Sequence, residues 1–295
     1  MIYKKKIIFI GNLIFSYELL KVILKNKNFQ IVGIVSKNNS NYNSDHFSLK
    51  EISRNNNIQY LNYKFKNDDQ LISFVKKLNP DYIFCFGWSH LLHPKVLKLT
   101  KISSIGYHPS NLPKNRGKHP IIWTIFLGLN KTASCFFELQ KKVDDGKILS
   151  KRILKINQNT DSTLLYKKLI VIAKIQLKDL LKKLVTVNKV NCLKKIYLKN
   201  EITKSNEWRK RSVEDGIIDW RMNAISILRL VKALKWPYNG SSFIYRKKAL
   251  KVINAKKLKE SSNEIDYEPG FIIKKVKNVF HIKCYDAILK ITTEN

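Results

Sequence analysis

The sequence has 295 residues, 44% of them hydrophobic, which is enough for one large domain or two modest ones with a proper core. It contains 56 Lys and Arg against 22 Asp and Glu, a formal net charge of +34. No stretch of about 18 apolar residues occurs, which excludes a predicted transmembrane helix. The start, MIYKKKIIFIGN, has too short an apolar part for a signal peptide and lacks a small-residue cleavage site, so we expect a cytoplasmic protein.

The excess of basic residues has two interpretations. Clustered cations would indicate a protein that binds nucleic acid or a membrane surface. Here the lysines are spread along the whole chain, as in a sequence biased toward Lys, Asn and Ile, and spread charge is usually solvated surface. We favour the second interpretation, although such a charge would also favour any anionic substrate.

The four cysteines indicate neither a disulfide framework nor a metal site. They are far apart, at Cys85, Cys135, Cys192 and Cys284, with no C-x-x-C pair and no Cys/His cluster at zinc-ligand spacing. We therefore expect reduced thiols and no metal.

The first part of the chain alternates short apolar runs with segments of helical periodicity. Strands are predicted at Lys4–Gly11, Ile31–Val35, Ile58–Leu61, Tyr82–Phe86 and Ser104–Tyr107, and helices at Ser16–Leu24, Leu49–Asn55, Leu71–Leu78 and Ile121–Leu129. This alternation predicts an α/β fold with a doubly wound, mostly parallel sheet. The G-x-G-x-x-G and G-x-x-x-x-G-K-[ST] loops are both missing, so only the α/β pattern would support a dinucleotide dehydrogenase or an ATPase.

The pattern changes in the last third of the chain. A strand at Ile148–Ile156 and a long helix from Asp161 to about Val185 are followed by a polar link. From Trp208 onward one helix, Ala224–Lys235, accompanies short strand-like runs at Ser242–Arg246, Ala249–Ile253, Gly270–Lys274, Val279–Ile282 and Ala287–Ile291. The pattern predicts a first domain of residues 1–204 and a smaller, β-rich domain of residues 205–295.

Two segments carry candidate chemistry. His108 follows the strand at Ser104–Tyr107 directly and precedes a loop rich in proline, asparagine and basic residues, a position where α/β proteins often carry their functional side chains. Asp144 lies in the sequence V-D-D-G after the apolar run Thr132–Leu139. A histidine and a carboxylate on loops at strand ends can form a proton-handling pair. Taken alone, each would more often be a structural histidine or a solvated D-G turn.

Together the motifs H-P-S-x-L-P-K-x-R-G-x-x-P, then T-x-x-x-F, then D-x-G-x-I-L resemble the 10-formyltetrahydrofolate-dependent formyltransferases, a family that includes methionyl-tRNA formyltransferase and the sugar N-formyltransferases. The resemblance continues through D-G-I-I-D-W at 215–220 and W-P-Y-N-G at 236–240, so it covers most of the chain in the order of the family. It implies a Rossmann-like formyltransferase fold with a barrel-like C-terminal domain, and 10-formyltetrahydrofolate as co-substrate.

The resemblance also implies roles for individual residues. His108 would donate a hydrogen bond to the formyl oxygen, and Asp144, two residues before the glycine, would orient it and help to move protons. The residues implied for folate binding are His90, Leu91, Leu92, Ser110, Asn111, Leu112, Pro113, Lys118 and Val143. Trp208, Arg209 and Tyr238 combine cations with aromatic rings and are candidates for binding a nucleotide, with domain packing as the alternative.

One position departs from the family pattern. Gly106 stands where the family usually has an asparagine whose amide helps to hold the oxyanion. On an extended strand Ser104, Gly106 and His108 face one side and Tyr107 the other, so Tyr107 cannot replace that amide. We expect a water molecule, or Ser104 through a water, to take its place.

The loop after the second strand favours one acceptor. Methionyl-tRNA formyltransferases resemble one another in a basic insertion at this point, whereas Ser36–Ser48 here has a single lysine and no such insertion. The resemblance is therefore closest to the sugar N-formyltransferases and implies a nucleotide-linked amino sugar, and by resemblance alone a homodimer. Formyl-tRNA synthesis is the alternative, supported by the net charge. A catalytically weak relative that binds folate or nucleotide is the other, supported by Gly106.

Overall fold

The structure is a computed structural model that describes residues 4–39, 44–64, 68–198, 204–258 and 267–294. The chain forms two compact units. The first comprises Met1–Pro120, Thr132–Lys155 and Lys167–Trp208, and the second Ile121–Lys131, Ile156–Tyr166 and Arg209–Asn295. The proposed division between residues 204 and 205 therefore stays a prediction, because two short segments from the middle of the chain also cluster with the C-terminal unit.

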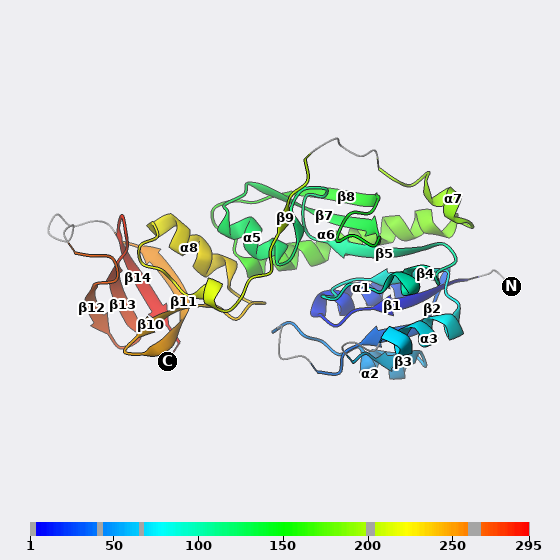
Figure 1. Cartoon of the computed structure of the whole chain (residues 1–295), viewed down its shortest axis with the longest axis horizontal. Helices are drawn as coiled ribbons and strands as arrows, with labels where there is room; N and C mark the ends of the chain where they lie inside the picture. Colours follow the sequence, from blue (N-terminus) through cyan, green and yellow to red (C-terminus); the bar gives the residue numbers. More distant parts are fainter. Residues whose placement is uncertain (1–3, 40–43, 65–67, 199–203, 259–266, 295) are drawn as a thin grey trace. The chain divides into compact units, whose positions relative to one another are not determined.

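The first unit is built on a seven-stranded sheet with the order β3-β2-β1-β4-β5-β7-β8 (Figure 1). The strands are β1 (Lys5–Ile10), β2 (Phe29–Ser36), β3 (Gln59–Asn62), β4 (Tyr82–Cys85), β5 (Ser103–His108), β7 (Lys131–Glu138) and β8 (Ile148–Lys155). The pairings from β3 to β5 are all parallel, and β7 runs antiparallel to β5. The predicted doubly wound, mostly parallel sheet is confirmed. Its central strands are continuous apolar runs because helices cover both faces.

Helices from opposite faces enclose this sheet. On one face the ring of Phe15 of α1 packs against the ring of Tyr107 of β5. On the same face Gln176 of α6 donates hydrogen bonds to β7 and β8, which α6 follows in Figure 1. On the other face α3 and α4 pack against the central strands through Leu71, Val75 and Val96. The helices of this part of the chain are α1 (Ile14–Leu24), α2 (Lys50–Asn55), α3 (Asp68–Leu78), α4 (Pro94–Leu97), α6 (Ser162–Val185) and α7 (Val190–Leu193).

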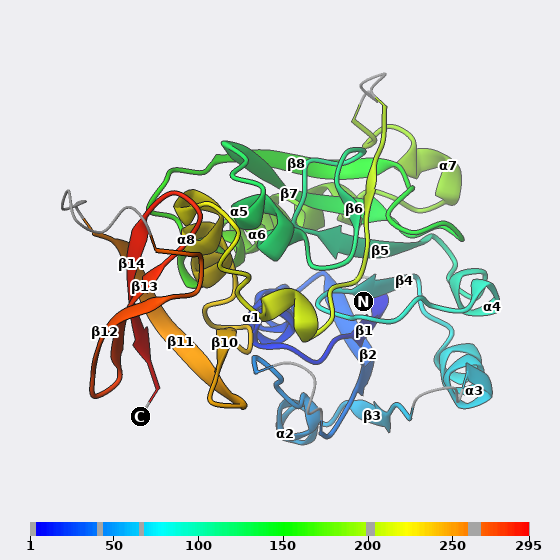
Figure 2. The ribbon, with the colours of Figure 1, turned by 60° about the vertical axis from the view of Figure 1, so that its left-hand side comes forward.

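The second unit contains an antiparallel five-stranded sheet, drawn in orange to red in Figure 2, with α8 packed against β11. Its strands are β10 (Ser241–Tyr245), β11 (Lys248–Lys257), β12 (Ile272–Val276), β13 (Val279–Lys283) and β14 (Ile288–Thr293), and its helices α5 (Pro120–Phe126), η1 (Glu214–Gly216) and α8 (Ala224–Ala233). Phe243 and Phe280 meet edge to face at 5.3 Å in its core. The predicted β-rich C-terminal unit is confirmed.

One strand pairing of the first unit was not predicted from the sequence. The two-residue strands β6 (Arg116–Gly117) and β9 (Glu207–Trp208) pair in parallel, which ties the loop after β5 to the link before the second unit. In the described part of the chain, no helix combines the length and the apolar character needed to cross a membrane.

Candidate active site

His108 and Asp144 meet at the C-terminal end of β5. The Nδ1 atom of His108 lies 3.4 Å from Oδ2 of Asp144, and its Nε2 atom lies 3.3 Å from the carbonyl oxygen of Asn115. Both side chains are largely buried, with exposed fractions of 9% and 16%. A neutral imidazole has one N–H for these two acceptors, so the same ring can hold its proton on the Asp144 side or on the Nε2 side.

The electrostatics of His108 favour the neutral form. Burial lowers the pKa of its imidazole, and the positive charge of Lys118 acts in the same direction. The negative charge of Asp144 and the hydrogen bond with Asn115 act in the opposite direction, but burial dominates and the net pKa is lowered. His108 is therefore a neutral proton donor or acceptor near neutral pH, which is the state that acid–base catalysis requires.

Backbone groups hold Asp144 in place. The N–H of Gly117 donates to Oδ2 of Asp144 at 3.0 Å, and Asp144 itself adopts a left-handed backbone conformation with φ of 48°. Gly146, the glycine of the D-x-G motif, allows the close approach of this turn to β7, because a Cβ there would overlap the carbonyl group of Glu138. Asp145 instead pairs with Arg116 at 2.5 Å, so the two adjacent carboxylates have different partners.

The loop after β5 is held from the far side by Asn206. Its side-chain oxygen accepts from the N–H of Asn115 at 2.9 Å, and its backbone oxygen accepts from the N–H of Arg116 at 3.0 Å. These contacts join segments 91 residues apart in sequence and position the carbonyl group that faces His108. Asn115 and Asn206 act through their backbone or through a single amide, and no local pattern in the sequence indicates them.

Apolar side chains occupy the space beside Gly106. A Cβ built there would lie 2.6 Å from Cδ2 of Leu139 and 3.1 Å from Cζ of Phe137. The alternation along β5 is as predicted, since Tyr107 points to the opposite face and meets Phe15 and Phe136. That a water molecule, or Ser104 through a water, replaces the missing amide stays a prediction. Ser104 has a buried hydroxyl with no hydrogen-bond partner among the described residues, and Leu139 occupies the space that a Cβ at position 106 would need.

The residues implied for folate binding have varied surroundings. Leu112 is 1% exposed and belongs to the core under the loop, and the Ser110 hydroxyl bonds to the carbonyl oxygen of Lys114. Asn111 carries a buried Oδ1 without a hydrogen-bond partner among the described residues. Lys118 donates to the carbonyl oxygen of Ser89 at 2.7 Å and so links the loop after β5 to the loop after β4. The remaining members are Leu91, which is exposed, and His90, Leu92, Pro113 and Val143, which are partly buried.

The three candidates for nucleotide binding are engaged within the chain. Trp208 pairs with β6 through its backbone in the first unit. In the second unit Arg209 forms a bidentate ion pair with Asp215 at 2.5 and 2.7 Å and lies 5.5 Å from the Trp123 ring. Tyr238 bonds through its N–H to the carbonyl oxygen of Lys235. The geometry gives Arg209 and Trp208 packing roles, so binding of a nucleotide by these residues stays a prediction.

Within the described ranges, no three His, Cys, Asp or Glu residues converge in a way that could hold a metal ion. The site thus offers a buried histidine paired with a carboxylate, a basic loop beside it and buried polar atoms awaiting partners. A parallel sheet with such a pair at the end of a central strand has the arrangement of an α/β enzyme, and a histidine beside a carboxylate is chemically able to move protons.

Residues 5–179 match the family described as "Formyl transferase", and residues 210–294 match its C-terminal domain. The chain belongs to the formyl transferase family, and formyl transfer is its reaction class.

Individual relatives differ in what they act on. The chain is 32% identical over 69% of its length to the bifunctional polymyxin resistance protein ArnA of Wigglesworthia glossinidia brevipalpis, but it spans only 30% of that protein. It is 29% identical to the methionyl-tRNA formyltransferase of Caldanaerobacter subterraneus subsp. tengcongensis, over 97% of this chain and 90% of the relative. Its fold is similar to that of an N-formyltransferase from Helicobacter canadensis solved with folinic acid and dTDP-3-aminofucose, with a TM-score of 0.70, 18% identity and coverage of 99% and 100% of the two chains.

Proposed function

We propose that this formyltransferase moves the formyl group of 10-formyltetrahydrofolate to the amino group of a nucleotide-linked amino sugar. The observation that carries the proposal is the buried His108–Asp144 pair, 3.4 Å apart, at the end of β5. The solved N-formyltransferase with folinic acid and dTDP-3-aminofucose supports both the donor and the acceptor class through its likeness in fold.

The chain's own residues supply proton handling. The attack of an amine on a formyl carbon generates a negative oxygen and a positively charged nitrogen, and both gain from a group that donates or accepts a proton. Neutral His108 can present an N–H to the developing oxyanion from Nε2 in place of its contact with Asn115. In the other tautomer, with its proton on Nδ1 toward Asp144, the ring can take the proton of the amine at Nε2, and Asp144, held by Gly117, stabilises the imidazolium that forms.

The residues present fit a folate. The buried Oδ1 of Asn111 is an acceptor without a partner among the described residues, and a pterin ring offers N–H donors for such an atom. Lys118 joins the two loops between which the pterin would lie. When bound, the folate supplies the activated formyl group.

The short loop after β2 supports a sugar over a tRNA as acceptor. Ser36 ends β2, and Asp45 is buried shortly before α2, with residues 40–43 of the loop outside the described ranges. With a single lysine between these points, the segment lacks the cations that would bind an acceptor stem.

The test is a transfer assay with 10-formyltetrahydrofolate against a panel of nucleotide-linked 3-amino and 4-amino sugars, followed by release of tetrahydrofolate. His108→Ala and Asp144→Asn should lower turnover by at least about 100-fold without loss of fold, because both remove proton handling at the reacting atoms. Asp145→Asn is the matched control, since Asp145 faces Arg116 and should leave turnover nearly unchanged. Full activity in both site variants would refute these roles.

A second candidate, formylation of methionyl-tRNA, is favoured by one specific feature of the C-terminal sheet. Lys274 of β12, His281 of β13, Lys290 of β14 and Lys256 of β11 lie directly opposite one another in the strand register. The three lysines are exposed, and within the described residues none of the four makes an ion pair. Like charges opposite each other destabilise a sheet, and such a row of about 14 Å suits a phosphate backbone.

The dependence of acceptor affinity on salt concentration distinguishes a tRNA acceptor from an amino-sugar acceptor. For a tRNA acceptor the apparent affinity should fall steeply with salt concentration, and replacing Lys256, Lys274 and Lys290 by Glu should weaken it strongly. For an amino-sugar acceptor the triple variant should keep both KM and kcat. Formylation of the tRNA alone, lost in the triple variant, would replace the sugar proposal by this second one.

A further inference from the structure

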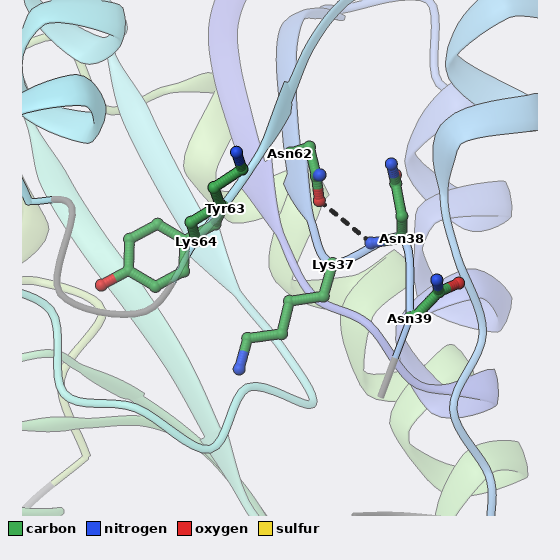
Figure 3. Close-up of a pocket in the computed structure, with 6 residues that line it drawn as sticks. All are labelled: Lys37, Asn38, Asn39, Asn62, Tyr63 and Lys64. Carbon is green, nitrogen blue, oxygen red and sulfur yellow. Dashed lines mark hydrogen bonds between the residues drawn. The ribbon is translucent and has the colours of Figure 1, made fainter. Parts of the chain in front are cut away.

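A cavity of about 460 Å³ opens beyond the C-terminal ends of β2 and β3 and is lined by Lys37, Asn38, Asn39, Asn62, Tyr63 and Lys64 (Figure 3). Its size is in the range of small-molecule pockets. Its lining carries the cations of two lysines and the amides of three asparagines beside the ring of Tyr63. Because ligands of open α/β sheets bind beyond the carboxyl ends of the strands, this position is suited to part of a substrate.

The amides of the cavity wall are held in place. The N–H of Asn38 donates to Oδ1 of Asn62 at 3.0 Å, the contact drawn in Figure 3, and Oδ1 of Asn38 accepts from the Tyr60 hydroxyl at 2.8 Å. His46 contacts the carbonyl oxygen of Asn38 at 3.1 Å. The side-chain oxygens of Asn38 and Asn62 both accept hydrogen bonds within the cavity wall. Their NH₂ groups can still donate to a ligand, and an anionic oxygen is a suitable acceptor.

Two basic groups meet beside this cavity. Nζ of Lys37 lies 2.6 Å from Nε2 of His90, and the same ammonium lies 5.6 Å from the ring of Trp88. An ammonium group has only donors, so the contact requires Nε2 as acceptor and therefore a neutral imidazole. Lys37 and His90 could both be cationic, but in this contact they share one positive charge. A bound anion would stabilise the form in which both groups are protonated.

We infer that Lys37 and His90, with the amides of Asn38 and Asn62, form a subsite for the anionic oxygens of a bound substrate. The order β2-β1-β4-β5 separates Lys37 from the His108 end of the sheet by three strand spacings, about 14 Å. An extended substrate can span that length with its reacting group at His108 and its charged group at Lys37. Phosphate oxygens of the acceptor and carboxylates of a folate glutamate share the required chemistry, and this assignment of ligands rests on the proposed function.

Protonation gives the subsite a recognisable response. Burial lowers the pKa of His90, and the charges of Lys37, from the end of β2, and of Lys118, from the loop after β5, lower it further. An anion placed between Lys37 and His90 opposes those charges, so its binding should draw a proton onto the imidazole. Proton uptake on binding therefore distinguishes this subsite from general attraction by the surface charge.

Calorimetric titration of the full chain tests the subsite with three probes: dTDP, folinic acid and the analogue of folinic acid without its glutamate. Lys37→Met should weaken the binding of one anionic probe about tenfold, the loss of one charge-assisted hydrogen bond. Lys37→Arg should restore most of it, and Lys76→Met, on an exposed position of α3, should change nothing. Titration in buffers of different ionisation enthalpy should show proton uptake that His90→Gln abolishes.

The following results of the titrations support or refute the subsite. Weakened dTDP binding supports the subsite with the phosphate as its ligand, and weakened folinic acid binding with an unchanged glutamate-free analogue supports it with the carboxylates. Unchanged affinity of Lys37→Met for all three probes would overturn the subsite while formyl transfer through His108 still stands. Failure of the unaltered chain to bind any probe would overturn both the subsite and the proposed function.

Discussion

Gly106→Asn is the substitution that most directly tests how this site is built. The new Cβ would lie 2.6 Å from Cδ2 of Leu139, about 1 Å inside a normal carbon–carbon contact, and Phe137 closes the same space. Overpacking of this kind costs about 1–3 kcal/mol. In a unit of this size each kcal/mol lowers the Tm by about 2–4 °C, so thermal unfolding should show a clear decrease.

Leu139→Ala should relieve the overlap. The losses of unfolding free energy caused by Gly106→Asn and by Leu139→Ala should not add. The double variant Gly106→Asn/Leu139→Ala should be about 1 kcal/mol or more above the stability that their sum predicts. Its amide would also lie on the same face of β5 as His108 and supply the oxyanion donor that Gly106 lacks, so kcat should exceed that of Gly106→Ala/Leu139→Ala on the order of 100-fold. A wild-type Tm for Gly106→Asn would show that Leu139 does not fill the space, and equal kcat values for the two double variants would refute a role for the amide.

Three further outcomes follow from other contacts. The pKa of His108 is lowered in the folded state, so the unfolded chain binds more protons below about pH 6.5, and the Tm of the wild type should fall on acidification more than that of His108→Gln. Glu138→Ala removes the acceptor of the Tyr197 hydroxyl at 2.7 Å, and hydrogen exchange should become faster in residues 194–198. The ion pair with Arg209 holds the pKa of Asp215 well below its usual range. Asp215→Asn breaks this pair, so the Tm of the variant should decrease less than that of the wild type as the pH falls below about 4.

The sheet, and the closeness of His108 and Asp144, could be predicted because local patterns determine them. Ile7 to Ile10 form a continuous apolar run, which is what a strand buried on both faces requires, and all four are completely buried. His108 directly follows such a run, and parallel strands bring their carboxyl ends to one edge. The topology alone therefore predicts that a side chain at that point lies near the other loops at the same edge of the sheet.

The surroundings of the pair could not be predicted, because they depend on contacts between distant segments. Lys37 and His90 are 53 residues apart and Asn115 and Asn206 are 91 apart, and each residue taken alone has the sequence context of a solvated loop. The apolar surroundings of Gly106 escaped prediction for a related reason. The alternation along β5 predicts which side Gly106 faces, but it cannot tell that Leu139, beyond the end of β7, turns onto the same face.

The departure at Gly106 does not by itself indicate a site that has lost its chemistry. The fold buries a histidine and lowers its pKa, holds Asp144 at a φ of 48°, and leaves Asn111 with a buried Oδ1 that finds no partner among the described residues. Each of these features costs stability, and they gather at one edge of the sheet, where strain and unsatisfied polar groups mark function rather than packing. A chain that used this edge only for packing would gain stability from an apolar residue at position 108. If His108 acts as proposed, we expect the activity to depend on His108 more than it would with an amide at position 106.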